Sequence, residues 1–328
     1  MRQCGPWRFA LLVLREKPTI VELNEPADVR SWTTLVPALL ARQLLRICGH
    51  RTRVVAYAIE NGDLEQWISS KFPRCKRLSV PIFTWLFFLI WSQYDRVAFG
   101  TTQAQHAYGA LGAYNKRNTG PHFQLVEALP SACSCLEQHA GPKSGVLFFG
   151  SLERRKGVHT LLQAMEHLSA DVEVTIVGTG PLEFLVTAAA QQDDRVQYFG
   201  EGNRTDMHRL MTRAEVVVLP SVREDRWREQ IGLPILEGLA HGCTIVTTTE
   251  GGMAEWLTRH GHHVTTPNDP VACANAIQAA VSMPLGRDAV LETLPERDGR
   301  LTADDWLGMP GRAYGSGGLT TDPRRRFR

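Results

Sequence analysis

Short apolar runs alternate with longer amphipathic segments through the second half of the chain, over residues 146–282. Each run has the length of a strand, and each segment between two runs is long enough for a helix. This alternation predicts βα units on a parallel sheet, and therefore an α/β fold. Ligands of such sheets bind beyond the carboxyl ends of the strands. The runs are Phe148–Phe149, Val174–Val177, Val196–Phe199, Val216–Leu219 and Thr244–Thr247.

The first half of the chain carries fewer such elements. Thr19–Leu23, Arg53–Ile59 and Asp95–Thr102 are predicted strands, and Val36–Cys48 has the pattern of an amphipathic helix. Because 328 residues make about two typical domains, we predict an N-terminal domain over 1–143 and a C-terminal domain over 144–285. Residues 286–328 are rich in Gly, Pro, Asp and Arg without sustained apolar periodicity, so we predict that they are largely disordered.

The strongly apolar segment Val80–Trp91 has two interpretations. It is shorter than the roughly 20 apolar residues of a transmembrane helix. It is either a helix buried against the sheet or a patch on a bilayer surface, and preceding basic residues would then face anionic lipid. Those basic residues are Lys71, Arg74, Lys76 and Arg77.

Composition and the N-terminus exclude several classes of protein. A net charge of +2 gives no electrostatic case for nucleic-acid binding. The seven cysteines form no paired framework, and Cys133-Ser134-Cys135 lacks a second pair at zinc spacing, so we predict free thiols and no metal.

The apolar run Phe9–Leu14 is shorter than the usual ~7–15 residues of a secretory signal. We therefore expect a cytoplasmic location, with peripheral contact at the inner membrane face as the second interpretation.

Glycines and charged residues follow the predicted strands, where a ligand site would lie. Gly150 and Lys156-Gly157 follow the first run, and Gly178 and Gly180 follow the second. Gly200 follows the third. Glu229 and Glu237, with seven residues between them, follow the fourth run, and Gly251-Gly252-Met253-Ala254-Glu255 follows the fifth.

In this order, the motifs resemble the C-terminal domain of retaining GT-B glycosyltransferases of family 4. The resemblance covers roughly residues 144–282 and implies two Rossmann-like domains that face each other across a cleft. The N-terminal domain is abbreviated, because the family's opening strand and glycine-rich loop are not found: Arg15-Glu16-Lys17-Pro18 follows the run Phe9–Leu14. Either the chain begins partway into the domain or the domain is a short variant.

The resemblance also implies a nucleoside diphosphate sugar as donor substrate, with no cofactor and no metal. The catalytic residues would be Glu229, which contacts the donor sugar, and Lys156, whose cation stabilises charge that develops on the diphosphate. Glu237 would hold the donor ribose. Glycines allow close backbone approach to a ligand, and N–H groups at a helix start suit phosphate. The implied donor-binding residues are Gly150, Arg155, Gly178, Gly180, Gln230, Ile231, Gly232 and Glu237.

The chain departs from the family pattern at three positions. Ser151 stands where the family usually has an arginine, and Arg155 is the candidate to replace that cation. Ile231 replaces an aromatic residue, and Asn24 stands at the strand end where a histidine is common. Each predicted site residue also has a simpler interpretation, as a surface lysine, an ordinary turn glycine or an exposed acid.

The predicted function is transfer of a sugar, with retention of configuration, from a nucleoside diphosphate to a glycan, lipid-linked or small-molecule acceptor. Two alternatives stay open. The chain could be a degenerate, non-catalytic relative that binds a nucleotide or a partner protein, which Ser151 and the short N-terminal domain favour. It could also be a nucleotide-sugar epimerase of GT-B fold.

Overall fold

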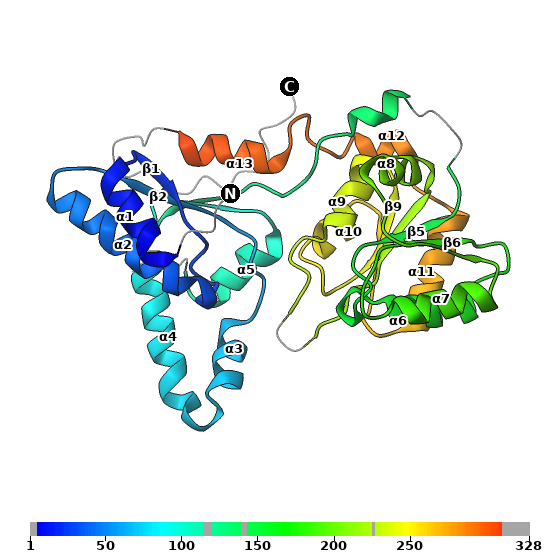
Figure 1. Ribbon diagram of the computed structural model, residues 1–328, viewed down its shortest axis with the longest axis horizontal. Coiled ribbons are helices and arrows are strands. Elements are labelled where there is room, and N and C mark those ends of the chain that lie inside the picture. Colours follow the sequence, from blue (N-terminus) through cyan, green and yellow to red (C-terminus); the bar gives the residue numbers. More distant parts are fainter. Residues whose placement is uncertain (1–4, 114–119, 139–142, 225–226, 310–328) are drawn as a thin grey trace.

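The computed structural model describes residues 5–113, 120–138, 143–224 and 227–309. Figure 1 shows two lobes, each with a parallel sheet flanked by helices. The N-terminal sheet has four strands and the C-terminal sheet has six. The predicted α/β class and the smaller N-terminal sheet are therefore confirmed.

The N-terminal strands lie in sequence order, β1-β2-β3-β4, and every neighbouring pair is parallel. The core of the N-terminal lobe contains a cluster of stacked and edge-on aromatic rings from Phe87, Trp91, Phe99 and Tyr108. The strands are β1 (Ile20–Glu22), β2 (Arg53–Ala58), β3 (Arg96–Phe99) and β4 (His122–Leu125). The helices are α1 (Pro6–Glu16), α2 (Trp32–Ile47), α3 (Leu64–Lys71), α4 (Lys76–Trp91) and α5 (Thr102–Ala110).

The two central strands of the C-terminal sheet, Val146–Phe149 and Val216–Leu219, are buried on both faces and consist wholly of Val, Leu and Phe, as expected for a parallel sheet covered by helices. The strands of this sheet are β5 (Val146–Phe149), β6 (Val174–Val177), β7 (Val196–Phe199), β8 (Val216–Leu219), β9 (Thr244–Thr248) and β10 (His263–Thr265). The helices are α6 (Val158–Ala164), α7 (Glu183–Gln192), α8 (Arg204–Arg213), α9 (Leu233–Ala240), α10 (Ala254–Arg259), α11 (Pro270–Ser282) and α12 (Arg287–Leu291). In Figure 1, α6, α7 and α11 lie on one side of the sheet, and α8, α9 and α12 on the other.

The C-terminal sheet has the strand order β10-β9-β8-β5-β6-β7. The chain starts at β5, builds outward through β6 and β7, then returns to the other side of β5 with β8. The order therefore reverses between β5 and β8, and such a switch point leaves a crevice at the carboxyl ends of the strands. The loops that follow β5 and β8 carry Lys156 and Glu229.

The prediction of disorder over 286–328 is wrong for the part that the structure describes. Residues 287–291 form α12, and Gly299–Gly308 forms a further helix, α13. Asp298 caps α13 by accepting hydrogen bonds from the N–H groups of Arg300 and Leu301. Residues 310–328 lie outside the described residues.

Helix α13 returns to the N-terminal lobe, as Figure 1 shows. Its buried Ala303 and Leu307 belong to a cluster with Val55 and Ala98 of the N-terminal sheet. A glycine at its start is required, because a Cβ on Gly299 would lie 2.0 Å from the carbonyl oxygen of Glu127. Ala303 and Leu307 are the only two side chains of α13 that are buried, which explains why the sequence shows no sustained periodicity here.

The apolar segment 80–91 lies in α4, which has one buried face and one exposed face. Phe87, Ile90 and Trp91 are buried in the core of the lobe. Leu78, Ile82, Trp85 and Leu89 form a second stripe whose side chains are 45–67% exposed. In the part of the chain that the structure describes, no helix is both long enough and apolar enough to cross a bilayer.

Candidate active site

The two loops at the switch point meet in a buried ion pair. Lys156 Nζ lies 2.6 Å from Glu229 Oε2, and the two side chains are only 13% and 9% exposed. The hydroxyl of Ser221 donates a hydrogen bond of 3.2 Å to the same carboxylate oxygen. Charged groups in this setting need a partner, because an uncompensated buried charge is strongly destabilising. The structure therefore brings together the two residues predicted to be catalytic.

The local backbone fixes Lys156 at this point. Residues Arg154–Lys156 form a short 3-10 turn, and Gly157 ends it with a φ of 76°. A Cβ at Gly157 would lie 1.9 Å from the carbonyl oxygen of Pro220, so only glycine lets the two loops approach this closely. The N–H of Val222 donates to the carbonyl of Arg155 at 3.0 Å, which joins the loops again.

Gly150, Gly178 and Gly180 form a closely packed floor at the ends of β5 and β6. All three have positive φ angles, of 137°, 142° and 155°. A Cβ on Gly178 would lie 1.9 Å from the carbonyl oxygen of Gly150, and one on Gly180 would lie 2.7 Å from that of Leu152. Gly178 and Gly180 are therefore required by the contact between two backbone loops, whatever else they bind, whereas Gly150 is favoured by its positive φ.

The segment after Glu229 leads into α9 and contains backbone N–H groups that make no hydrogen bond to a described residue. Gly232 is the N-cap of α9 and has a φ of 84°. None of the hydrogen bonds between described residues uses the N–H groups of Gln230, Ile231 or Gly232. Free N–H groups at a helix N-terminus are suited to an anion. The side chain of Ile231 packs against the core of the lobe.

Gly252 holds this segment from the other side. Its N–H donates to the carbonyl of Glu229 at 2.9 Å, and a Cβ on it would lie 1.8 Å from the carbonyl oxygen of Gln230. Gly251 forms an isolated parallel bridge with Glu229. The glycine pair predicted from the sequence therefore positions the backbone of the first acid.

Glu237 lies apart from the ion pair, on the exposed surface of α9. Surrounding groups partly shield its carboxyl from water and raise its pKa, while the nearby side chains of His208 and Arg204 oppose that shift. No described side chain makes a hydrogen bond with this carboxylate. It is consequently available to a ligand.

A cavity of about 1090 Å³ opens between the two lobes. Of the predicted site residues, Arg155 and Gln230 line it, and each is the direct neighbour of one member of the ion pair. Arg155 pairs with Glu153, and its guanidinium lies 4.4 Å from the centre of the Trp227 ring. The N-terminal lobe contributes three acids to the lining, Asp28, Glu60 and Asp63, and one base, Arg30.

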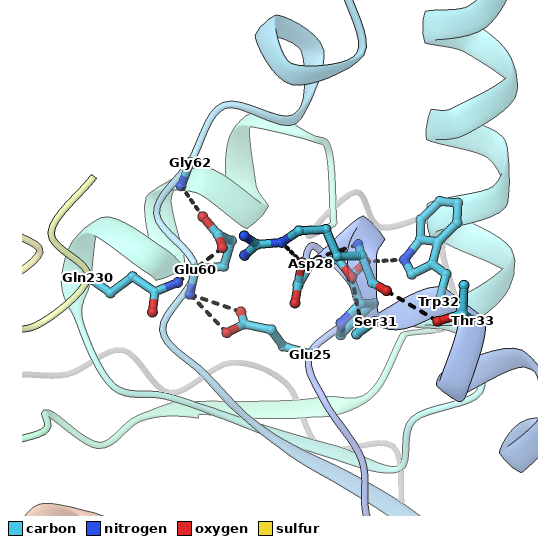
Figure 2. Close-up of polar contacts among 10 residues, drawn as sticks. Glu25, Asp28, Ser31, Trp32, Thr33, Glu60, Gly62 and Gln230 are labelled. Atoms are coloured by element: carbon cyan, nitrogen blue, oxygen red, sulfur yellow. Dashed lines mark hydrogen bonds and ion pairs between the residues drawn. The ribbon is translucent and has the colours of Figure 1, made fainter. Parts of the chain in front are cut away.

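The loop after β2 crosses the cleft, and sequence analysis missed its role. Asn61 Nδ2 donates to the carbonyl of Glu229 at 3.0 Å. Gln230 Nε2 donates to Glu60 Oε2 at 3.0 Å, as Figure 2 shows. Asn61 is only 5% exposed, and its Oδ1 has no hydrogen-bond partner among the described residues. A buried acceptor without a partner is unusual, so this oxygen is a candidate ligand contact.

Glu25 holds that loop in place from beneath. Its carboxylate accepts hydrogen bonds from the N–H groups of Ile59 and Glu60, at 2.9 and 3.0 Å, and from the hydroxyl of Tyr108 at 3.0 Å. Figure 2 shows the carboxylate pointing at the backbone of Glu60. Burial raises the pKa of Glu25 to about 7, against the lowering effect of these hydrogen bonds. The only sequence cue was its place at the end of the first predicted strand.

A family model described as Glycosyl transferases group 1 matches residues 143–283. The chain is 31% identical, over 136 residues, to D-rhamnosyltransferase WbpZ of Pseudomonas aeruginosa, a match that spans 40% of this chain and 34% of the relative. It is 28% identical over 176 residues to glycogen synthase of Mycobacterium tuberculosis, spanning 50% of this chain and 41% of the relative. The matched segments are thus less than half of each curated relative.

Solved structures match nearly the whole chain. Anabaena Alr3699/HepE in complex with UDP superposes with a TM-score of 0.65 at 16% identity, covering 92% of this chain and 82% of that one. The Escherichia coli structure titled trehalose-6-phosphate bound with UDP-2-fluoro glucose has a TM-score of 0.66 at 13% identity, covering 94% of this chain and 77% of that one. These similarities confirm the predicted GT-B architecture, with both lobes included.

The two neighbouring glycines after β9 should respond differently to alanine. In Gly252→Ala the new Cβ would meet a backbone carbonyl, which must shift, so we expect a loss of about 1–3 kcal/mol in the free energy of unfolding. In Gly251→Ala the nearest atom is 3.7 Å away, and a change within about 0.5 kcal/mol is expected. Urea unfolding of both variants checks this, and equal losses would show that the loop is not packed as described.

Glu25 should make stability depend on pH. Its pKa in the fold, about 7, lies above the ordinary value of 4.5, so its contribution is fully present below pH 4.5 and is lost as the pH rises through 7. The loss should be about 3 kcal/mol. Glu25→Gln, neutral throughout, should gain that amount relative to wild type between pH 4.5 and 7.5, whereas the exposed Glu65→Gln should not. Denaturant titrations across this pH range give the difference, and a flat difference for Glu25→Gln would refute the assignment.

Proposed function

We propose that this chain, whose residues 143–283 match the family model described as Glycosyl transferases group 1, moves a sugar from a nucleoside diphosphate to an acceptor with retention of configuration. The observation that carries the proposal is the buried Lys156–Glu229 pair at the switch point of the C-terminal sheet. It sits where open α/β sheets bind their ligands. The donor would enter the cleft between the lobes.

Lys156 would bind the diphosphate of the donor. An ammonium group carries three N–H donors, and the hydrogen bond to Glu229 uses one of them. The others are free to contact phosphate oxygens, on which negative charge grows as the bond to the sugar breaks. A fixed cation stabilises that charge more in the transition state than in the ground state. The unused N–H groups of Gln230 to Gly232 and the guanidinium of Arg155 would add to this effect.

Two acids and one amide would hold the rest of the donor. Glu229 would accept hydrogen bonds from hydroxyls of the donor sugar, and Glu237 from those of the ribose. The unpartnered Oδ1 of Asn61 would accept a further hydroxyl from the N-terminal side of the cleft. The acceptor hydroxyl would attack on the face that the leaving phosphate occupies, so that the phosphate itself takes the proton and no strong protein base is needed.

A second candidate function is nucleotide binding without transfer. The N-terminal sheet has only four strands, and Ser151 occupies the usual arginine position. Alignment of both reactants across the cleft supplies roughly 7–11 kcal/mol of barrier reduction in well-oriented reactions. A complete donor half with a poor acceptor wall would bind nucleotide normally but transfer slowly. Measuring affinity and sugar transfer on the same preparation separates the two functions.

Amide substitutions should separate the roles of the two acids. Glu237→Gln should weaken binding of UDP, GDP or ADP about 10- to 150-fold, because a charge-assisted hydrogen bond to the ribose is lost. Glu229→Gln should lower turnover and leave diphosphate affinity near wild type in protein that is folded by circular dichroism, because the amide oxygen can still accept the hydrogen bond of Lys156. The exposed Glu166→Gln serves as control. Calorimetry with each nucleotide, paired with donor-hydrolysis and transfer rates, gives both numbers. Equal loss of affinity in both variants would overturn the assignment.

Nucleotide binding itself is checked by thermal denaturation. A nucleotide at about 100 times its dissociation constant should stabilise the fold by about 2.7 kcal/mol. No stabilisation by any of the three nucleotides at millimolar concentration would remove the basis of the proposal.

We also propose a cytoplasmic location, where nucleotide sugars are made, with the exposed stripe of α4 resting on an anionic bilayer. The stripe consists of Leu78, Ile82, Trp85 and Leu89, and exposed basic residues precede it. Apolar side chains would enter the headgroup region while Arg and Lys face anionic lipid. An acceptor carried by a lipid would then meet the cleft of a bound enzyme.

Vesicle sedimentation checks this contact. Basic residues near an anionic surface add about 1 kcal/mol each, so Arg74→Gln/Arg77→Gln should reduce partitioning to phosphatidylserine vesicles roughly 30-fold. Trp85→Ser should also reduce it, whereas Phe184→Ser, which removes an equally exposed aromatic ring from the other lobe, should not. Equal binding by all variants, or equal binding to neutral vesicles, would contradict the proposal.

A further inference from the structure

Four metal-ligating side chains from distant parts of the sequence meet at one point outside the cleft. Cys133 and Cys135 come from the connector between the lobes, His208 from α8, and His241 from the end of α9. One ligand atom of each lies within 4.8 Å of all the others. Sequence analysis interpreted these cysteines as free thiols, because neither histidine lies near them in the sequence.

The distances within this cluster approach those of a tetrahedral metal site. Cys133 Sγ lies 2.9 Å from Cys135 Sγ and 3.6 Å from His208 Nδ1. His241 Nε2 lies 3.2 Å from Cys135 Sγ and 3.1 Å from His208 Nδ1. Zinc bonds of about 2.3 Å to sulfur and 2.0–2.1 Å to nitrogen give tetrahedral edges of roughly 3.3–3.8 Å. A small outward movement of the four side chains is enough to admit an ion.

Hydrogen bonds from neighbouring groups hold two of the four metal-ligating residues in position. His241 Nδ1 lies 2.6 Å from the carbonyl oxygen of Glu237, so it carries the proton and leaves the Nε2 lone pair facing the thiols. This is the usual outer contact of a metal-bound histidine. The N–H of Cys133 donates to the carbonyl of Ala240 at 2.8 Å, which fixes the connector against the end of α9.

Positive groups lie nearby but do not occupy the centre. Lys143 Nζ donates to the carbonyl of His241 at 3.1 Å, and the exposed Arg204 Nε lies 3.4 Å from His208 Nε2. When His208 binds a metal through Nδ1, its Nε2 carries a proton, so the Arg204 side chain turns toward solvent. The two thiolates cancel the charge of one divalent ion.

We propose that Cys133, Cys135, His208 and His241 bind one zinc ion. Four protein ligands close the coordination shell, which is the pattern of structural rather than catalytic zinc. The ion would fasten the connector to α8 and α9. Through His241 it would also fix the backbone of Glu237, which lies one turn earlier on α9. The site is separate from the cleft, and zinc binding does not depend on the proposed transferase activity.

The test measures zinc in the full chain. Wild type is equilibrated with zinc and a reductant, desalted, and analysed by plasma mass spectrometry; we expect one zinc per chain. Cys133→Ser/Cys135→Ser and His208→Ala should fall to background. Cys48→Ser/Cys75→Ser and His159→Ala, which change exposed residues elsewhere, should keep the metal. Wild type that holds no more zinc than the Cys133→Ser/Cys135→Ser variant overturns the proposal.

Two further measurements guard against variants that fail to fold. Wild type stripped of zinc and reloaded with Co²⁺ should show the thiolate charge-transfer absorption and the intense visible bands of a tetrahedral site. Removing zinc from wild type should lower Tm by roughly 5–10 °C, and the same chelator should leave the Tm of Cys133→Ser/Cys135→Ser unchanged. Absence of the cobalt bands, or a Cys133–Cys135 disulfide in reduced and zinc-equilibrated protein, also overturns the proposal.

Discussion

The ion pair between Lys156 and Glu229 is the contact around which the C-terminal lobe is organised at the carboxyl ends of its strands. It can form only because the strand order reverses between β5 and β8, which places the loops after these strands side by side. Gly157 and Gly252 allow the backbone segments to approach this closely, since a Cβ at either position would collide with a carbonyl oxygen of the neighbouring segment. The pair is buried, so neither charge tolerates the loss of the other.

The segment that carries Glu229 also joins the two lobes. The backbone of Glu229 accepts from Asn61, and the side chain of Gln230 donates to Glu60, both on the loop after β2. That loop is held by the buried carboxylate of Glu25. A donor bound to Lys156 and Glu229 would therefore contact the same segment that forms hydrogen bonds with the N-terminal side of the cleft. Helix α13 and the connector with the Cys–His cluster join the lobes at a second place, away from the cleft.

Local patterns in the sequence predicted most of the C-terminal lobe. Its central strands are continuous apolar runs, and the glycines, Lys156 and the acid pair follow the strands in one family's order. The ion pair itself was not predicted, since Lys156 and Glu229 meet only through the strand order. Asn61 and the Cys–His cluster were missed for the same reason: their partners lie far away along the chain. Helix α13 was missed because it buries few apolar residues. Helix α1 was missed because its run, Phe9–Leu14, was compared only with the family's opening strand and with a secretory signal.

The most direct test of the central claim is phosphorus NMR of a nucleoside diphosphate with the full chain. If Lys156 lies beside the diphosphate, the β-phosphorus resonance of UDP, GDP or ADP will shift on addition of wild type. The double variant Lys156→Met/Glu229→Gln removes both charges together, so no buried charge is left without a partner. The account predicts that this variant, folded by circular dichroism, leaves the resonance at its free position. An equal shift with wild type and with the double variant would contradict it.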